Sequence, residues 1–201
     1  MIRIICFLYC CFLTQVVFAS TNILVIGDSI SAGYGLQQNQ SWVSLLQQRI
    51  DKKEYPYIVI NASISGDTSD NGLLRIKTSL ELHKPSIVVI ELGGNDGLRG
   101  LSLKNMKKNL AEIIHLCQQK KSKVLLVGMN LPPNYGPAYT QRFSEIYVEL
   151  AKEFNIPLVP FLLKGIESNL KYFQKDQIHP TAEAQKFLLN NVWEGLHPLL
   201  K

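Results

Sequence analysis

Cysteine is scarce in this 201-residue chain outside its N-terminal segment. Cys6, Cys10 and Cys11 lie in that segment, which leaves Cys117 alone in the rest of the chain. An intrachain disulfide within residues 20–201 is therefore excluded, and packing must stabilise the fold. Because Cys117 lies on the apolar stripe of an expected helix, we interpret it as a small core residue rather than a nucleophile.

The chain also has no dense run of Lys and Arg, no low-complexity tract and no long hydrophobic run beyond its N-terminal segment. With 21 Lys plus Arg against 16 Asp plus Glu, the net charge is only +5, which does not indicate nucleic-acid binding. It permits transient contact with anionic membrane lipid or an acidic substrate. A hydrophobic content of 46% excludes a disordered or fibrous chain, and the length suits one globular domain, expected to be a monomer.

The N-terminus has the pattern of a secretory signal peptide. Arg3 supplies a positive charge, Ile4–Phe18 is almost entirely apolar, and Ala19 is the small residue that a cleavage site requires. A retained membrane anchor is the alternative, but polar residues interrupt an apolar run that is short of the roughly 20 residues a bilayer requires. We expect residues 1–19 to be a signal peptide, residues 20–201 to be a single domain, and the protein to be exported to the periplasm or secreted.

Five short apolar runs alternate with amphipathic segments along the rest of the chain. Runs nearly continuous in Ile, Val and Leu are typical of strands buried on both faces of a parallel sheet. The apolar residues between them have helical spacing, and Ser41 is placed to cap the first long helix. The expected strands are Ile23–Ile26, Tyr57–Ile60, Ile87–Glu91, Val124–Val127 and Pro157–Val159.

Strands that alternate with helices predict an α/β fold, a three-layer α/β/α sandwich around a five-stranded parallel sheet. Right-handed crossovers favour a flavodoxin-like order, with the first strand between the second and the third. Ligands of such sheets bind at the carboxyl ends of the strands, so the chemistry is expected there. The irregular segments that leave those ends are Gly27–Gly35, Asn61–Asn71, Gly93–Gly100 and Asn130–Gly136.

Ser29 lies in Gly27-Asp28-Ser29-Ile30, where the first strand gives way to a turn. A helix cap is the simplest interpretation of a serine at such a position. A phosphate-binding loop is disfavoured, because Gly27, Gly33 and Gly35 do not fit G-x-G-x-x-G and no lysine follows. A third interpretation is a nucleophile, which needs a base because a serine hydroxyl alone is weakly reactive.

Of the four histidines, only His179 has an acid nearby in a loop, in Asp176-Gln177-Ile178-His179-Pro180. Asp176 could hold one ring nitrogen and leave the other to face Ser29, as in a Ser-His-Asp triad. A surface ion pair and a pair of metal ligands are the alternatives. A metal would need a third ligand, and no second His or Cys cluster supplies one. We therefore expect neither a metal nor a cofactor.

Acyl transfer also requires donors for the oxygen that becomes negative. Gly66 follows the second expected strand and Asn95 the third, and these strands flank the first in the expected order. The backbone amides of Ser29 and Gly66 and the side-chain amide of Asn95 would then converge on one point. Taken singly, Gly66 and Asn95 are ordinary turn residues.

Gly27-Asp28-Ser29, Gly66, Gly93-Gly94-Asn95 and Asp176-x-x-His179 match in order the four blocks of the SGNH (GDSL) hydrolase family. The chain resembles the bacterial periplasmic thioesterase I, lysophospholipase and arylesterase branch of that family along essentially its whole length after the leader. One departure is Ile30, where the family motif has leucine. Both side chains are apolar, so the replacement removes no group that the reaction needs.

The resemblance implies a serine hydrolase that cleaves acyl esters and thioesters, with a lysophospholipid among its candidate substrates. It implies that Ser29 is the nucleophile, His179 the general base and Asp176 the residue that orients it. Gly66, Asn95 and the Ser29 amide would form the oxyanion hole. Leu98, Leu131 and Pro132 are the apolar substrate contacts expected in the walls of the acyl pocket. An esterase acting on acetylated carbohydrates and an exported, non-catalytic lipid-binding protein are the alternatives.

Overall fold

The apolar runs of the sequence form one parallel sheet in the computed structural model, which describes residues 21–200. The expected signal peptide, residues 1–19, lies outside the described residues. The strand order is β2-β1-β3-β4-β5, which confirms the flavodoxin-like arrangement. The strands are β1 (Thr21–Gly27), β2 (Tyr57–Asn61), β3 (Ile87–Glu91), β4 (Lys123–Val127) and β5 (Leu158–Val159).

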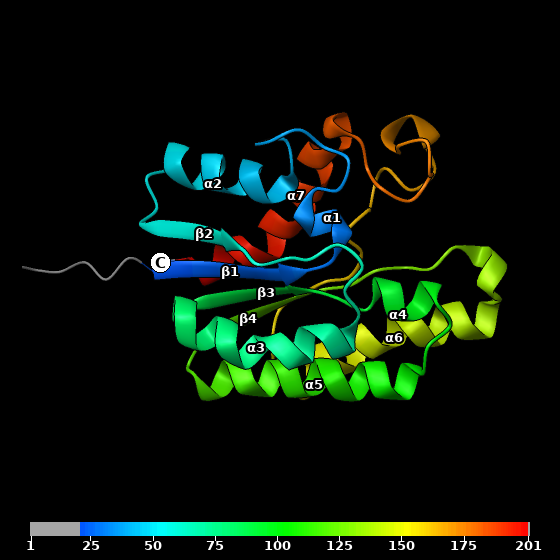
Figure 1. Cartoon of the computed structure of the whole chain (residues 1–201), viewed down its shortest axis with the longest axis horizontal. Helices are drawn as coiled ribbons and strands as arrows, with labels where there is room; N and C mark the ends of the chain where they lie inside the picture. The colour runs from blue at the N-terminus through cyan, green and yellow to red at the C-terminus, as the bar shows by residue number, and fades with distance from the viewer. Residues whose placement is uncertain (1–20, 201) are drawn as a thin grey trace, which may run out of the picture.

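Helices cover both faces of this sheet and complete the predicted three-layer α/β/α sandwich. Figure 1 shows α2 and α7 on one side of the sheet and α3, α5 and α6 on the other. The helices are α1 (Ser29–Ala32), α2 (Trp42–Lys52), α3 (Ser69–His83), α4 (Gly94–Leu98), α5 (Leu103–Gln119), α6 (Pro137–Glu153) and α7 (Gln185–Leu196). Short 3₁₀ turns are η1 (Pro133–Tyr135), η2 (Leu170–Tyr172), η3 (Ala182–Ala184) and η4 (His197–Leu199).

The central strands β1 and β3 are apolar because both of their faces are covered. Every residue of β3 is buried, as is β1 from residue 23 to its end. In the register of these two strands Val25 lies beside Val89. Burying one Ile, Leu or Val side chain contributes about 1.5–3 kcal/mol. The two strands that carry the loops of Ser29 and Asn95 are therefore anchored in the core.

Two predictions about the helices are confirmed in detail. The Ser41 hydroxyl accepts a hydrogen bond from the Ser44 amide at 3.2 Å and so caps α2. On α5, the apolar stripe that contains Met106 and Cys117 is fully buried. Cys117 is a free thiol in this core, and burial raises its pKa to about 12. It is therefore a packing residue, as expected.

Two short helices, α1 and α4, lie within segments that were expected to be irregular. α4 begins immediately after Gly93, whose φ of 108° is a conformation that favours glycine. A Cβ atom at Gly93 would also lie 2.5 Å from the Tyr147 hydroxyl on α6. The tight turn after β3 therefore requires glycine. It aims α4 across the carboxyl edge of the sheet, the edge at which α1 also begins (Figure 1).

No helix within residues 21–200 is both long enough and apolar enough to cross a membrane.

Candidate active site

Ser29 is the first residue of α1 and directly follows the turn that leaves β1. Asp28 is the N-cap, and its Oδ1 atom accepts a hydrogen bond of 3.0 Å from the Ile30 amide. This cap holds the turn in place and leaves the Ser29 side chain facing a cavity. The helix-cap interpretation of the sequence thus applies to Asp28 and not to Ser29.

His179 lies between Ser29 and Asp176, although 150 residues separate it from the serine. Its Nε2 atom is 2.8 Å from the Ser29 hydroxyl, and its Nδ1 atom is 2.7 Å from Asp176 Oδ2. The ionised carboxylate can only accept, so Nδ1 carries the hydrogen and Nε2 is free to accept one from Ser29. The structure therefore brings the three predicted residues into one hydrogen-bonded chain.

Asp176 is held ionised by its own loop. Its Oδ1 atom accepts hydrogen bonds of 3.0 Å from the backbone amides of both Ile178 and His179. The backbone hydrogen bond from His179, with the bonds from its side chain and from the Ile178 amide, lowers the pKa of Asp176 to about 2. Hydrogen bonds to a carboxylate favour its charged form. Asp176 therefore remains an anion at any pH at which a neutral imidazole could act as a base.

Gly66 and Asn95 lie beside Ser29 in the same cavity. Among the described residues, 21–200, the backbone amides of Ser29 and Gly66 donate to no other group, so both are available to an anionic oxygen. The Asn95 side-chain nitrogen instead donates to Asp28 Oδ2 at 3.1 Å and to the Asp67 carbonyl at 2.9 Å. Both of its hydrogens thus have partners within the protein.

Arg99 connects two of these groups. Its guanidinium donates to the Gly66 carbonyl at 2.9 Å and to Asn95 Oδ1 at 3.4 Å. Because Asn95 Oδ1 faces a cation, its amide nitrogen must point toward Asp28 and Asp67. Arg99 therefore helps to set the orientation of the Asn95 side chain.

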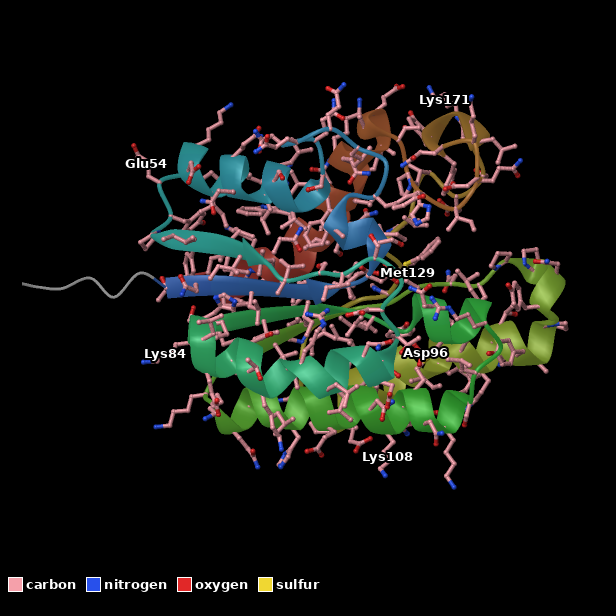
Figure 2. The ribbon with its side chains drawn as sticks, in the orientation of Figure 1. Glu54, Lys84, Asp96, Lys108, Met129 and Lys171 are labelled. Carbon is pink, nitrogen blue, oxygen red and sulfur yellow. The ribbon has the colours of Figure 1, made fainter. Side chains whose placement is uncertain are left out.

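The cavity has a volume of about 760 Å³ and lies beyond the carboxyl ends of the strands. Figure 2 labels Met129, one of its lining residues, between the two helical layers at this edge. The predicted contacts Leu98, Leu131 and Pro132 all line it. Sequence reasoning missed four other apolar lining residues, Phe161, Leu163, Phe173 and Ile178.

Comparison with known proteins agrees with this geometry. A family model described as "GDSL-like Lipase/Acylhydrolase family" matches residues 25–187. The chain belongs to this family. The resemblance inferred from the sequence motifs is thereby confirmed.

Relatives of the GDSL-like family resemble the chain over most of its length. Esterase TesA of Pseudomonas aeruginosa is 50% identical over 182 residues, which are 90% of each chain. "Thioesterase 1/protease 1/lysophospholipase L1" of Escherichia coli K12 is 41% identical over 194 residues, 96% of this chain and 92% of that protein. A crystal structure of TesA superposes with a TM-score of 0.88 at 50% identity and covers 90% of this chain and all of that one.

Two residues near Ser29 in this GDSL-like site were not singled out from the sequence. The ring of Tyr34 lies against the His179 ring, with their centroids 4.5 Å apart. Asp28 is only 3% exposed, and burial raises its pKa to about 6. The only feature of the sequence that could have drawn attention to Asp28 was its position beside a candidate nucleophile. Its burial depends on β3 and α4 and is not visible in the local sequence.

Other histidines and acids form no comparable cluster in the part of the chain that the structure describes. No three His, Cys, Asp or Glu side chains within residues 21–200 gather as ligands of a metal ion would. His115 is exposed and contacts Gln119, four residues further along α5. His197 contacts Tyr55 near the C-terminus.

Proposed function

We propose that this protein is a serine hydrolase that cleaves acyl esters and thioesters through a Ser29–His179–Asp176 triad. The observation that carries the proposal is the continuous chain of two short hydrogen bonds from the Ser29 hydroxyl through His179 to Asp176. Membership of the acylhydrolase family and relatives named esterase and thioesterase support the same reaction class.

In the first half of the reaction, the Ser29 oxygen attacks the acyl carbonyl while His179 Nε2 takes the hydroxyl proton. The carbonyl oxygen becomes an oxyanion, which accepts hydrogen bonds from the amides of Ser29 and Gly66. The Asn95 side chain adds a third donor when one of its hydrogens turns from Asp28 or Asp67 to the oxyanion. His179 then returns the proton to the departing alcohol or thiol, and an acyl ester of Ser29 remains.

In the second half, His179 removes a proton from a water molecule, which attacks the acyl-Ser29 carbonyl. The second tetrahedral intermediate collapses, Ser29 regains its proton from His179, and a carboxylic acid is released. Asp176 stays ionised throughout and stabilises the imidazolium that forms in each half. No step requires a metal or a cofactor.

The cavity supports a substrate with an apolar acyl chain. A volume of about 760 Å³ lies in the range of sites for small organic molecules, and most of the lining side chains are apolar. Each methylene group buried there contributes about 0.8 kcal/mol of binding free energy. This favours an acyl chain over an acetylated sugar, which would need polar partners. Lysophospholipids and aryl esters belong to the same proposal, because relatives carry those names.

Transient contact with membrane lipid is a further part of the proposal. Tyr34 and Ile178 line the cavity and are about half exposed, and the exposed Ile64 lies next to the cavity residue Ser65. We also propose export after removal of residues 1–19, a single domain over residues 20–201, and a monomer. Intact mass and light scattering of the protein recovered from the periplasm would test these three points.

Labelling with a fluorophosphonate tests the function directly. The wild-type protein should lose activity and gain one covalent adduct on Ser29. Ser29→Ala should take up no label and hydrolyse neither esters nor thioesters, while its circular dichroism stays that of the wild type. Ser63→Ala, a nearby serine outside the cavity, is the matched control and should label normally. Hydrolysis by Ser29→Ala at the wild-type rate would show that another nucleophile acts.

A further inference from the structure

Glu91 is a buried carboxyl group that the proposed mechanism does not use. It ends β3, is fully buried, and does not line the cavity. Its Oε2 atom accepts a hydrogen bond of 2.7 Å from the Ser31 hydroxyl and a longer one of 3.4 Å from the Asp28 amide. Its Oε1 atom has no partner within residues 21–200, and no cation there pairs with the carboxyl group.

We propose that Glu91 is a positioning residue for Ser29, which fixes the turn between β1 and α1 without touching the substrate. This inference rests on the proposed function, because it assigns a role in the reaction of Ser29. The groups that Glu91 holds lie on either side of the nucleophile. One is the amide of the residue before Ser29, and the other is the hydroxyl of Ser31, two residues after it.

The packing around Gly27 supports this role. Gly27 lies beside Glu91 in the register of β1 and β3. A Cβ atom at Gly27 would lie 2.8 Å from Glu91 Oε2 and 2.8 Å from Ser31 Cβ, which is too close for any side chain. The glycine thus allows the carboxyl group and Ser31 to close against the turn. Small displacements of a nucleophile matter, because a shift of about 1 Å can lower the rate about a hundred-fold.

Glu91 fills this role as the uncharged acid. Burial, and then the nearby Asp28, raise its pKa well above the ordinary value. The other ionisable groups around the turn offer it no ion pair: Tyr147 on α6 donates to the Leu92 carbonyl, and Arg75 on α3 donates to the Gly27 carbonyl. An anion at Glu91 would also repel the oxyanion formed on the other side of the turn. A neutral carboxyl group supplies the acceptor without that repulsion.

The test compares Glu91→Gln, Glu91→Leu and Ser31→Ala in steady-state hydrolysis of a soluble ester. The glutamine keeps a neutral acceptor for Ser31, so kcat should stay within about three-fold of wild type with the same pH profile. The leucine removes the acceptor, so kcat should fall about 10- to 100-fold while KM changes less than about two-fold. Ser31→Ala removes the same bond from the other side and should lower kcat in the same direction.

Ser122→Ala is the matched control for Ser31→Ala. Ser122 is also a buried serine, but its hydroxyl donates to the Pro85 carbonyl at the opposite end of the sheet. It should lower the melting temperature without lowering kcat, so an effect of Ser31→Ala on kcat cannot come from lost stability alone. If Glu91→Leu does not fold, Ser31→Ala and Glu91→Gln still decide the question.

Normal kcat in both Glu91→Leu and Ser31→Ala would overturn the inference. So would a loss of kcat in Glu91→Gln as large as that in Glu91→Leu. A third refuting result is a rise in KM at constant kcat in Glu91→Leu. Fluorophosphonate labelling separates this failure from that of the function. A wild-type protein that takes up no label would refute the proposed function itself. Labelling of wild type and Glu91→Leu at the same rate would refute only the role of Glu91.

Discussion

Replacing Asp28 with asparagine measures what a buried carboxylate beside the nucleophile costs the folded state. Asp28 is 3% exposed and accepts hydrogen bonds from the Ile30 amide and the Asn95 side chain. These bonds, and the nearby His179, offset only part of the loss of hydration. Burial therefore raises the pKa of Asp28 from 3.8 to about 6.

The shifted pKa of Asp28 makes the stability of the folded protein depend on pH. Because the folded-state pKa exceeds the unfolded value, the folded protein binds this proton more tightly. The resulting stability is fully present below about pH 4 and is lost as the pH rises through about 6. A rise in the pKa of Asp28 from 3.8 to about 6 corresponds to about 3 kcal/mol of unfolding free energy. The asparagine side chain cannot titrate, so the variant should not lose this stability.

The substitution Asp28→Asn also lowers the free energy of unfolding by an amount that does not depend on pH. The asparagine can still accept from the Ile30 amide, but its NH₂ group then meets the NH₂ group of Asn95. Two donors without an acceptor cost about 1–3 kcal/mol at every pH. The prediction therefore concerns how the difference in stability between the two proteins changes with pH, and not its value at one pH.

Urea unfolding of both proteins from about pH 4 to about pH 8 gives this difference. It should move in favour of Asp28→Asn by about 3 kcal/mol, equivalent to about 6–12 °C in melting temperature. The other carboxyl groups are the same in both proteins, so their titration largely cancels, apart from that of Glu91, whose pKa Asp28 also raises. A difference that stays constant over this range, or that moves toward the wild type as the pH rises, would refute the reasoning.

Three further predictions concern the reaction itself. Asp176→Asn should favour the wrong tautomer of His179 and lower kcat by about 10³- to 10⁴-fold with little change in KM; a loss of less than about ten-fold in steady-state hydrolysis would contradict the triad. Gly66→Ala forces a side chain onto a residue at φ 87°. It should lower kcat more than about ten-fold through a displaced oxyanion donor, whereas normal kcat would exclude the Gly66 amide from that role. Leu98→Trp should shorten the cavity, so kcat/KM for decanoyl relative to acetyl esters should fall about ten-fold or more, and an unchanged ratio would place the chain elsewhere.

The sequence predicted the sheet well because its central strands, β1 and β3, are buried on both faces. Up to its last residue, Glu91, the run Ile87–Glu91 has no polar residue to mark an exposed face, and its observed bounds are the predicted ones. The right-handed crossover rule then leaves few orders for the strands. Once the order is known, the loops after β1, β2 and β3 must meet at one edge. The proximity of Ser29, Gly66 and Asn95 follows from topology.

Helix α4 could not be predicted, because its cause is a contact distant in sequence. Its five residues include two glycines, which disfavour a helix. Asp96 stabilises it from within the first turn: its carboxylate accepts bonds from the Ser69 amide at 2.8 Å and the Ser69 hydroxyl at 2.6 Å. Those partners lie at the start of α3. Tertiary contacts here override the local preference.

The other apolar residues that line the cavity had no signal in the sequence for a related reason. Phe161, Leu163 and Phe173 lie in a long connection without regular periodicity. That connection is held in place by contacts such as the hydrogen bond of 2.8 Å from the Gln174 side chain to the Tyr34 carbonyl. A local pattern can identify the apolar residues, but only the folded chain shows which of them line the cavity that contains His179.

The burial of Asp28 and Glu91 could not be predicted from the sequence either, since two carboxyl groups close together in a core contradict the usual pattern of burial. The pair is tolerable if Glu91 keeps its proton, because then no like charges face each other. This can be measured with Asp28→Asn, Glu91→Gln and the double variant at about pH 8. With Glu91 neutral, the two groups share no charge repulsion, so the double variant should not be less stable than the sum of the single effects by more than about 1 kcal/mol. A coupling energy above about 1 kcal/mol, with the double variant less stable than the sum of the single effects, would mean that each substitution alone relieves the same repulsion and that both groups are charged.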